Sequence, residues 1–348
     1  YLSQPIDGVW NNWTYNEVMD EVRKMASYIK SLNLEKKSKI AILSKNCAHW
    51  IMSDLAIMMS GHISVPLYPN LSAKILNKIL IHSETKMMFV GKLDDFESQK
   101  SGLPEIHKIS MGLYNQETGV LWEAIIAKQD ALVNIKLPQK ENLHTIIYTS
   151  GTTGIPKGVM HSSGNFLESS NTLNWHFEFP NNLKLFSYLP LAHVAERVLV
   201  NAGMVFGGNV TFAESLETFA KELEATQPHL FFAVPRIWTK FREKILETIP
   251  QKKLNILLKI PVINAIIKRK LKQKLGLSEA VFIASAAAPI ASSLVKWYRK
   301  LDIKILQGYG MTEDCCVSHF NTHQNEKPNL PSKYPDLFVN GLSIQRKN

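Results

Sequence analysis

The sequence predicts an α/β protein with two mostly parallel sheets flanked by helices. Two observations lead to this prediction. Short apolar segments of strand length alternate along the chain with longer amphipathic segments, which is the pattern of repeated βα units. The chain also has 348 residues, 45% hydrophobic and 20% charged, which is enough for one large domain or two closely associated subdomains.

The first half of the chain contains the clearest alternation. Thr14-Tyr15-Asn16-Glu17 has the sequence of a capping box, so we expect a helix from there to about Leu32. Residues 91–118 are polar and predict an irregular connection. The other expected elements are strands at Lys39 to Leu43, Ile63 to Leu67 and Met87 to Val90, and helices at Cys47 to Met59 and Ile75 to His82.

The second half repeats the alternation. A helix is expected after the loop that follows the first strand, and another at Leu216 to Ala225. The polar tail, 321–348, contains three prolines and predicts at most one short element, Leu337 to Ile344. The expected strands are Thr145 to Tyr148, Leu185 to Tyr188, Asn209 to Phe212, Leu230 to Ala233, Val281 to Ala284 and Ile303 to Leu306.

One loop has the composition of a phosphate-binding site. The run from Tyr148 to Gly158 reads Tyr-Thr-Ser-Gly-Thr-Thr-Gly-Ile-Pro-Lys-Gly and follows an apolar strand. Glycines let backbone N–H groups approach an anion, hydroxyls add donors and Lys157 adds a positive charge. The pattern differs from a Walker A loop, because Lys157 follows a proline instead of a glycine. A Ser/Thr/Gly-rich surface turn is the alternative.

Three candidate loops each follow a predicted strand: this phosphate loop, the alanine-rich run after Val281 to Ala284, and the Gly-Tyr-Gly run after Ile303 to Leu306. Ligands of open α/β sheets bind at the carboxyl ends of the strands. We therefore expect the three loops to converge on one crevice.

These segments resemble, in the expected order, the motifs of the adenylate-forming (AMP-binding) superfamily, and of its long-chain fatty acid–CoA ligases in particular. The resemblance extends from about Trp13 to Glu313. Beside the phosphate loop it covers Val65 to Pro69 with Leu71 to Ala73, Leu189 to Arg197 as the second core motif, Val234 to Trp238 as a long-chain segment, Ala284 to Pro289 as the adenine loop and Gln307 to Glu313 as the fifth motif.

The resemblance implies that residues 1–320 form the large N-terminal AMP-binding domain, with interleaved subdomains at roughly 1–140 and 141–320. Residues 321–348 would be an incomplete tail. No Tyr-x-Thr-Gly-Asp motif follows Glu313, so we expect the ribose-binding motif, the hinge and the lysine-bearing C-terminal domain to be absent from this sequence. Such a chain would be poorly active alone.

The implied reaction has two steps. A fatty acid carboxylate attacks the α-phosphate of ATP to give an acyl-adenylate and pyrophosphate, and the thiol of CoA then displaces AMP. The protein must hold two anions together and stabilise charge at phosphorus. The implied cofactors are ATP and Mg²⁺, with CoA as co-substrate, because magnesium shares that charge through a few oxygen ligands.

The resemblance also assigns residues. Lys157 would neutralise the β- and γ-phosphates, and Glu313 and Thr152 would bind magnesium; a helix-capping role is the alternative for Glu313. Tyr309 would lie against adenine or be a buried core aromatic. The expected catalytic residues are Lys157, Thr152, Glu313 and His193. The implied nucleotide-binding residues are Thr149, Ser150, Gly151, Thr152, Thr153, Gly154, Lys157, Ser285, Ala286, Ala287, Gln307, Gly308, Tyr309, Gly310 and Thr312.

The acyl site is implied at His193 and Trp238. By resemblance His193 lies between the acyl chain and the reacting carboxylate, and Trp238 gates the acyl tunnel; ordinary packing is the alternative for both. Lining is expected from Leu230 to Val234 and from Val205 to Gly208. Glu196 and Arg197 could pair on a helix surface. Ala286 replaces a glycine that is usual in this family, and its methyl group could weaken ATP binding.

The net charge of +10 is concentrated in one segment. Residues 251–277 contain eight basic residues and no acidic one, so this segment alone has a charge of +8. Its lysines alternate with apolar residues, which suggests docking on an anionic membrane surface. A solvated basic face is the alternative. The concentration of charge argues against a nucleic-acid-binding protein.

Three cysteines without zinc spacing, and no apolar run of about 18 residues, favour a cytoplasmic protein that is peripheral at most. A homodimer is also an expectation. Two other functions stay open: an adenylating enzyme for another acid or for a carrier-protein acceptor, and a membrane-associated protein with a degenerate nucleotide site.

Overall fold

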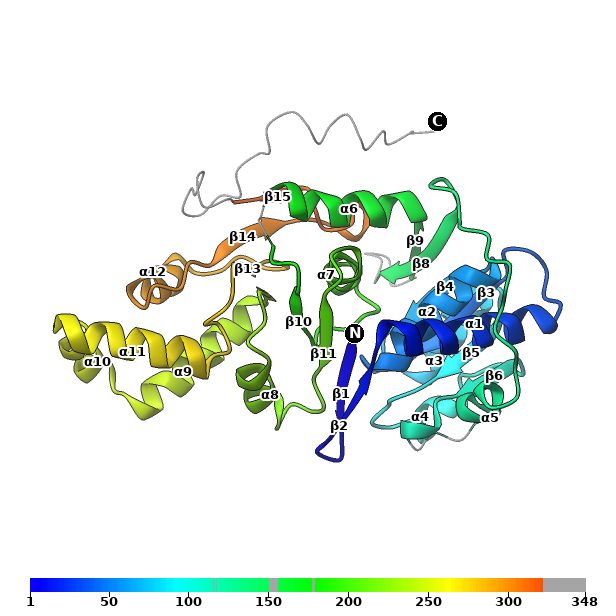
Figure 1. The fold of residues 1–348 in the computed structure, drawn as a ribbon, viewed down its shortest axis with the longest axis horizontal. Coiled ribbons are helices and arrows are strands. Elements are labelled where there is room, and N and C mark those ends of the chain that lie inside the picture. Colours follow the sequence, from blue (N-terminus) through cyan, green and yellow to red (C-terminus); the bar gives the residue numbers. More distant parts are fainter. Residues whose placement is uncertain (115, 117, 150–155, 177–178, 322–348) are drawn as a thin grey trace. The chain divides into compact units, whose positions relative to one another are not determined.

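The structure is a computed structural model that describes residues 1–321 except 115, 117, 150–155 and 177–178. Two compact units are present (Figure 1). The first contains Tyr1–Ser170, Ser187–Ala202 and Asn209–Phe212, and the second contains Asn171–Phe186, Gly203–Gly208 and the chain from Ala213 onward. The subdomains expected at 1–140 and 141–320 divide the chain differently, and that assignment stays a prediction.

The first unit is built on a seven-stranded sheet of order β7-β6-β5-β3-β4-β8-β9. All its strand pairs are parallel except β8–β9, which form an antiparallel hairpin. The strands are β3 (Lys39–Leu43), β4 (Ile63–Leu67), β5 (Thr85–Val90), β6 (His107–Ser110), β7 (Val120–Leu121), β8 (Leu143–Thr149) and β9 (Lys157–Ser162).

The first unit also contains helices, of which α1 (Tyr15–Ser31), α2 (Ala48–Ser60) and α3 (Ala73–His82) flank this sheet (Figure 1). The others are α4 (Glu97–Lys100), α5 (Trp122–Ile126), the first part of α6 (Ser163–His176), most of α7 (Val194–Val205) and the 3-10 turn η1 (Gly112–Tyr114). Three further strands belong to the first unit, in which β1 (Leu2–Ile6) runs parallel to β11 (Asn209–Phe212) and antiparallel to β2 (Val9–Trp13).

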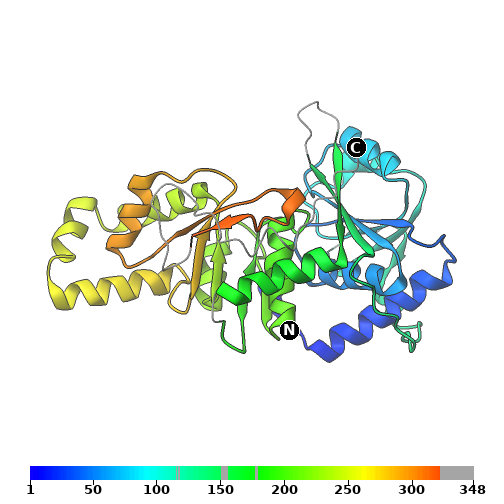
Figure 2. The same ribbon diagram turned by 90° about the horizontal axis from the view of Figure 1, so that it is seen from above.

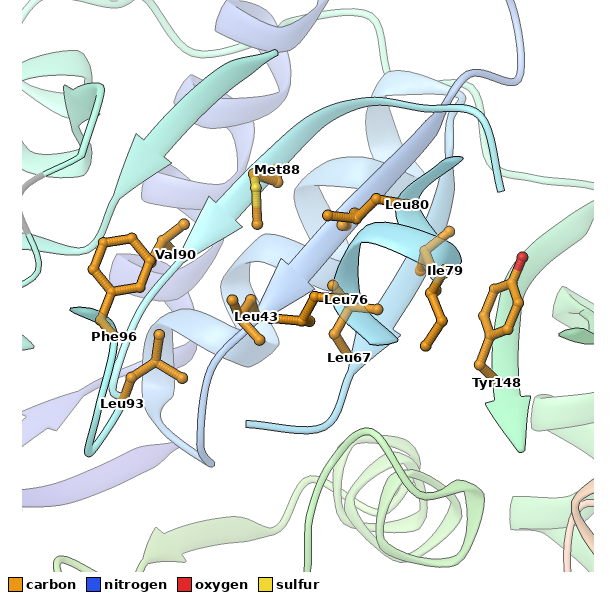
Figure 3. Packing of buried hydrophobic residues seen from close by; sticks show 12 residues of the cluster. Leu43, Leu67, Leu76, Ile79, Leu80, Met88, Val90, Leu93, Phe96 and Tyr148 are labelled. Atoms are coloured by element: carbon orange, nitrogen blue, oxygen red, sulfur yellow. The ribbon is translucent and has the colours of Figure 1, made fainter. Parts of the chain in front are cut away.

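One hydrophobic cluster of the first unit lies where α3 packs on the central strands (Figure 3). Leu76, Ile79 and Leu80 of α3 point toward Leu67 and the neighbouring strand residues. Central parallel strands are covered on both faces, which is why these segments are almost continuously apolar. Each fully buried aliphatic side chain contributes roughly 1.5–3 kcal/mol.

The predicted capping box of α1 is confirmed. The Thr14 hydroxyl accepts a hydrogen bond from Glu17 N at 3.2 Å, and the Glu17 carboxylate accepts one from Thr14 N at 2.7 Å. The apolar stripe from Val22 to Ile29 is buried against the unit. Local sequence therefore determines where this helix begins and which face it buries.

The second unit contains five strands in the order β15-β14-β13-β12-β10. The pairs β10–β12, β12–β13 and β13–β14 are parallel, and β15 is antiparallel to β14. The strands are β10 (Lys184–Ser187), β12 (Leu230–Phe232), β13 (Phe282–Ser285), β14 (Leu306–Tyr309) and β15 (His319–Phe320). The helices are α8 (Phe219–Thr226), α9 (Pro235–Thr248), α10 (Gln251–Leu257), α11 (Pro261–Lys274), α12 (Ser292–Lys300) and the turn η2 (Thr312–Asp314).

The predicted fold class, two mostly parallel sheets flanked by helices, is confirmed. Several details differ from the expected elements. A strand, β9, precedes the helix expected after the phosphate loop, and β6 lies inside the connection expected at 91–118. The strand expected at Ile303 to Leu306 begins only at Leu306, and the β1–β2 hairpin was not predicted. These strands are short or polar, so sheet pairing decides them more than local pattern. The element suggested at Leu337 to Ile344 lies outside the described residues.

Within the described residues, no helix combines the length and the apolar character needed to cross a bilayer.

A buried ion pair connects three elements of the first unit. Arg197 of α7 is 2% exposed and donates to Asp54 Oδ2 of α2 at 2.7 Å and to Thr145 Oγ1 of β8 at 2.8 Å. Its guanidinium also lies over the rings of Trp50 and Phe166. Burial alone would raise the pKa of Asp54, but Arg197 and then His144 lower it below its usual range. Asp54 is therefore ionised, and the pair is a fixed internal contact.

Removing one member of this pair should destabilise the fold more than replacing both. Asp54→Leu leaves a buried guanidinium without its carboxylate and should lower the free energy of unfolding by about 3–5 kcal/mol. Asp54→Leu with Arg197→Met should lose clearly less. Urea denaturation followed by circular dichroism measures both values. If the double variant loses as much free energy of unfolding as Asp54→Leu and Arg197→Met lose together, this interpretation is contradicted.

Candidate functional site

The two described ends of the phosphate loop lie opposite each other on the β8–β9 hairpin. Thr149, the last residue of β8, pairs with Lys157, the first residue of β9. A Cβ on Gly158 would lie 2.7 Å from Ile146 Cγ2, so glycine is required beside Tyr148. Lys157 is exposed. Ser150, Gly151, Thr152, Thr153 and Gly154 lie outside the described residues.

Asn46 holds the segment that leads to His193. Its side-chain amide donates to Ser187 Oγ at 2.9 Å and to the Leu189 carbonyl at 2.6 Å, and its Oδ1 accepts from Leu191 N at 2.9 Å. Asn46 is buried between β3 and α2. One side chain thus satisfies the backbone of an irregular segment that could not otherwise be buried.

His193 is half-buried at the start of α7. Burial lowers its pKa, so the imidazole is neutral at neutral pH. Ala195 N–H donates to Nδ1 at 3.2 Å, which leaves the ring proton on Nε2. His193 can therefore offer one N–H donor to a ligand carboxylate or phosphate.

Glu196 and Arg197 do not pair on a surface, so that expectation was wrong. Both are buried, and they take different partners: Arg197 binds Asp54, whereas Glu196 Oε1 accepts from Tyr188 N at 3.0 Å. Consecutive helical residues point in different directions and cannot face each other. Burial raises the pKa of Glu196 to about 8, against hydrogen bonds from Ser187 and Tyr188 N.

In the second unit, the alanine-rich loop begins at the end of β13. Ser285 is 2% exposed, and its hydroxyl has no hydrogen-bond partner among the described residues. Ala286 is half-buried and Ala287 is exposed, with a left-handed φ of +68° at Ala287. The backbone strain thus falls one residue after the alanine that replaces the usual glycine.

The Gly-Tyr-Gly loop is compact because its glycines contact other residues closely. A Cβ on Gly308 would lie 2.5 Å from the Phe320 ring, and one on Gly310 would lie 2.4 Å from Cys316 Cα. Tyr309 is 53% exposed, so it is not a buried core aromatic. Gln307 is the β-sheet partner of Ser285. The two loops of the second unit therefore leave neighbouring strands at the same edge.

Glu313 lies on η2 and is exposed. The capping role belongs to its neighbour: Asp314 Oδ1 accepts from Met311 N at 2.8 Å and from Cys316 N at 2.9 Å, and Oδ2 accepts from the Ser318 hydroxyl. Cys315 and Cys316 both have left-handed φ angles, +56° and +59°. Asp314 thus stabilises a strained turn that presents Glu313 to solvent.

Trp238 is fully buried in the second unit. Its ring meets Phe231, Phe241 and Tyr298 edge-on, with centroids 5.2–6.1 Å apart, and its carbonyl accepts from the Tyr298 hydroxyl at 2.6 Å. It packs as a core residue beside the predicted lining strand Leu230 to Val234. The gating role stays a prediction.

The structure therefore groups the predicted residues within each unit. Thr149, Lys157 and His193 belong to the first unit. The second unit holds Ser285, Ala286, Ala287, Gln307, Gly308, Tyr309, Gly310, Thr312 and Glu313, with Trp238 in its core. Convergence of the three loops on one crevice stays a prediction.

The AMP-binding enzyme family model matches residues 3–335, nearly the whole chain. The chain belongs to this family. Long chain acyl-CoA synthetase 5 of Arabidopsis thaliana is 30% identical over 94% of this chain and 55% of its own length. Fatty acyl-CoA synthetase B of Dictyostelium discoideum is 28% identical over 87% of this chain and 50% of its own length. The chain spans about half the length of the curated relatives it matches.

Solved structures share the fold. An anthranilate CoA ligase in complex with anthranoyl-AMP superposes with a TM-score of 0.75 at 18% identity, over 94% of this chain and 60% of that one. The A-PCP didomain of carboxylic acid reductase from Segniliparus rugosus, in complex with AMP, superposes with a TM-score of 0.72 at 21% identity. The match covers 89% of this chain and 50% of that one. At these identities the likeness supports the AMP-binding fold alone.

Sequence reasoning missed two polar residues of this AMP-binding chain. Asn46 and Asp314 organise the segments that carry His193 and Glu313, but neither belongs to a quoted motif. The partners of Asn46 lie more than 140 residues away in sequence, so no local pattern could identify it. Asp314 was detectable, since Asp accepts readily from nearby backbone N–H groups in turns.

The buried Glu196 should make stability depend on pH. Its folded pKa, about 8, lies above the ordinary 4.5. Its stabilising contribution is therefore complete below about 4.5 and is lost as pH rises through 8. We expect the free energy of unfolding to fall by a few kcal/mol between pH 5 and pH 9, and Glu196→Gln to flatten this slope. Urea titrations across that range measure it; equal slopes in both proteins would contradict the assignment.

Asp314→Ala should loosen the turn that carries Glu313. The Met311 amide loses its carboxylate acceptor, and a hydrogen bond to a charged group is worth about 1.5–3 kcal/mol. Hydrogen exchange measured by mass spectrometry should show at least about tenfold faster exchange at Met311. Glu313→Gln is the matched control and should leave that amide protected. Unchanged exchange in Asp314→Ala would show that the turn holds without this contact.

Proposed function

We propose that this AMP-binding enzyme activates a long-chain fatty acid with ATP, forms an acyl-adenylate and transfers the acyl group to CoA, releasing pyrophosphate and AMP. The observation that carries the proposal is the family match over residues 3–335, together with long-chain acyl-CoA synthetases among the relatives. The carboxylate of the fatty acid is itself the nucleophile, so the protein needs no nucleophilic side chain.

The first unit would supply the residues that bind the phosphates and the reacting carboxylate. Lys157 is exposed beside Thr149 at the mouth of the hairpin, and an exposed ammonium on a fixed strand can neutralise the β- and γ-phosphates. The neutral His193 could donate from Nε2 to the reacting carboxylate. Holding both anions in place lowers the entropy cost of the attack.

The second unit would supply the adenine and metal contacts. The buried Ser285 hydroxyl lacks a described partner and could bind the nucleotide, and the exposed Tyr309 ring could lie against the base. Glu313 and Thr152 would hold Mg²⁺, because carboxylate and hydroxyl oxygens are the ligands it prefers. The bound ion would neutralise the developing phosphate charge.

The acyl chain would lie beside Trp238, along Leu230 to Val234 and 205–208. Trp238 is fully enclosed by aromatic neighbours. A gating role would require the Trp238 ring to move out of these contacts. The space that it left would be an apolar path for the acyl tail.

We place the enzyme in the cytoplasm at a membrane surface, where long-chain acids accumulate. We also propose a homodimer.

ATP–pyrophosphate exchange with a panel of acids tests the function. Palmitate should support exchange better than octanoate or benzoate, and Lys157→Ala should lower the rate at least about tenfold. Lys136→Ala, which removes another exposed lysine of the first unit, is the matched control and should match wild type. Exchange driven by benzoate alone would assign an aryl substrate, and no nucleotide binding at all would favour a degenerate site.

A further inference from the structure

Helices α10 and α11 present an unusual surface at one end of the second unit, away from β15 in both views (Figure 1, Figure 2). Four aliphatic side chains are exposed there, with Ile256 63% and Val262 72% exposed, followed by Ile260 and Ile266. No residue of α11 is buried. Such a group of exposed aliphatic residues costs free energy in water unless another surface covers it.

The helical register places apolar and basic groups on one stripe. Val262, Ile266 and Lys270 are spaced by four residues along α11, and Arg269 follows Ile266 by three, so all four share a face. Ile256 and Ile260 flank the turn from α10 into α11. The stripe therefore has an aliphatic end and a cationic end.

Most of the cations of this surface have no ion pair in the described part of the chain. Within 251–277, Lys272 pairs with Asp302 and Lys274 pairs with Glu224. Five other basic residues are exposed and have no ion pair among the described residues: Lys252, Lys253, Lys259, Arg269 and Lys270. The segment contains no acidic residue.

Buried residues in α10 and just after α11 anchor the two helices. Leu254 of α10 is buried, Leu277 is buried three residues after the end of α11, and Gln251 of α10 accepts a hydrogen bond from Trp297 Nε1 at 2.8 Å. The exposed face is therefore presented by a fixed element of the fold.

We propose that the α10–α11 face docks on an anionic lipid bilayer. Its aliphatic residues would enter the headgroup–acyl boundary, and its five exposed cations would lie among anionic headgroups. A bilayer fits because it satisfies both halves of the stripe, whereas an acidic protein would satisfy the charge and leave the aliphatic residues exposed. Docking would place the enzyme where long-chain acids partition, and this role rests on the proposed function.

Vesicle cosedimentation of the 348-residue chain, without ATP, tests the docking face. Wild type should bind phosphatidylcholine vesicles containing phosphatidylserine much better than pure phosphatidylcholine, and high salt should weaken binding. Changing Lys252, Lys253, Lys259, Arg269 and Lys270 to Gln should lower the partition coefficient at least about tenfold. Val262→Ser with Ile266→Ser should weaken binding at both salt concentrations.

The matched control changes five exposed lysines of the first unit to Gln: Lys30, Lys36, Lys74, Lys78 and Lys86. It has the same net charge and should bind like wild type. Equal loss in the control would show diffuse attraction and overturn the proposal. So would a wild type that ignores both vesicle types but binds polyglutamate. Because no ATP is present, such a failure would leave the ligase function standing.

Discussion

The first unit depends on the buried contact between Arg197 and Asp54. A guanidinium that is 2% exposed must be matched by a carboxylate, and Asp54 lies 2.7 Å from it. The contact joins α7, which begins with the His193 segment, to α2 and to the start of β8, whose far end opens the phosphate loop. Since an unpaired buried charge is costly, these elements are held in one arrangement.

Both units use the same physical device at the segments proposed for chemistry. In each unit, hydrogen bonds to one carboxylate or amide side chain fix an irregular backbone segment next to a residue proposed for chemistry, which is the half-buried His193 in one case and the exposed Glu313 in the other. Asn46 does this for the segment before His193, and Asp314 does it for the turn that presents Glu313. Preorganised polar groups of this kind stabilise charge without reorganising during a reaction.

Much of the fold could be predicted from local sequence, because periodic apolar strands and a capping box act over a few residues. The α1 start and the strand at Lys39–Leu43 are examples. The strand β9 was missed because Gly158 and Lys157 are poor strand formers, and its pairing with β8 decides the conformation. The partner of Arg197 was missed because Asp54 is 143 residues away. Site residues followed from motif resemblance, whereas their supporting contacts required the three-dimensional structure.

We expect the segment from Thr149 to Gly158 to bind the phosphates of ATP through Lys157. Isothermal titration of ATP and of AMP into wild type and Lys157→Ala measures this contact. Lys157 is assigned to the β- and γ-phosphates, so the variant should lose at least about tenfold in ATP affinity and keep its AMP affinity. Equal losses for both nucleotides, or unchanged ATP affinity, would contradict the account.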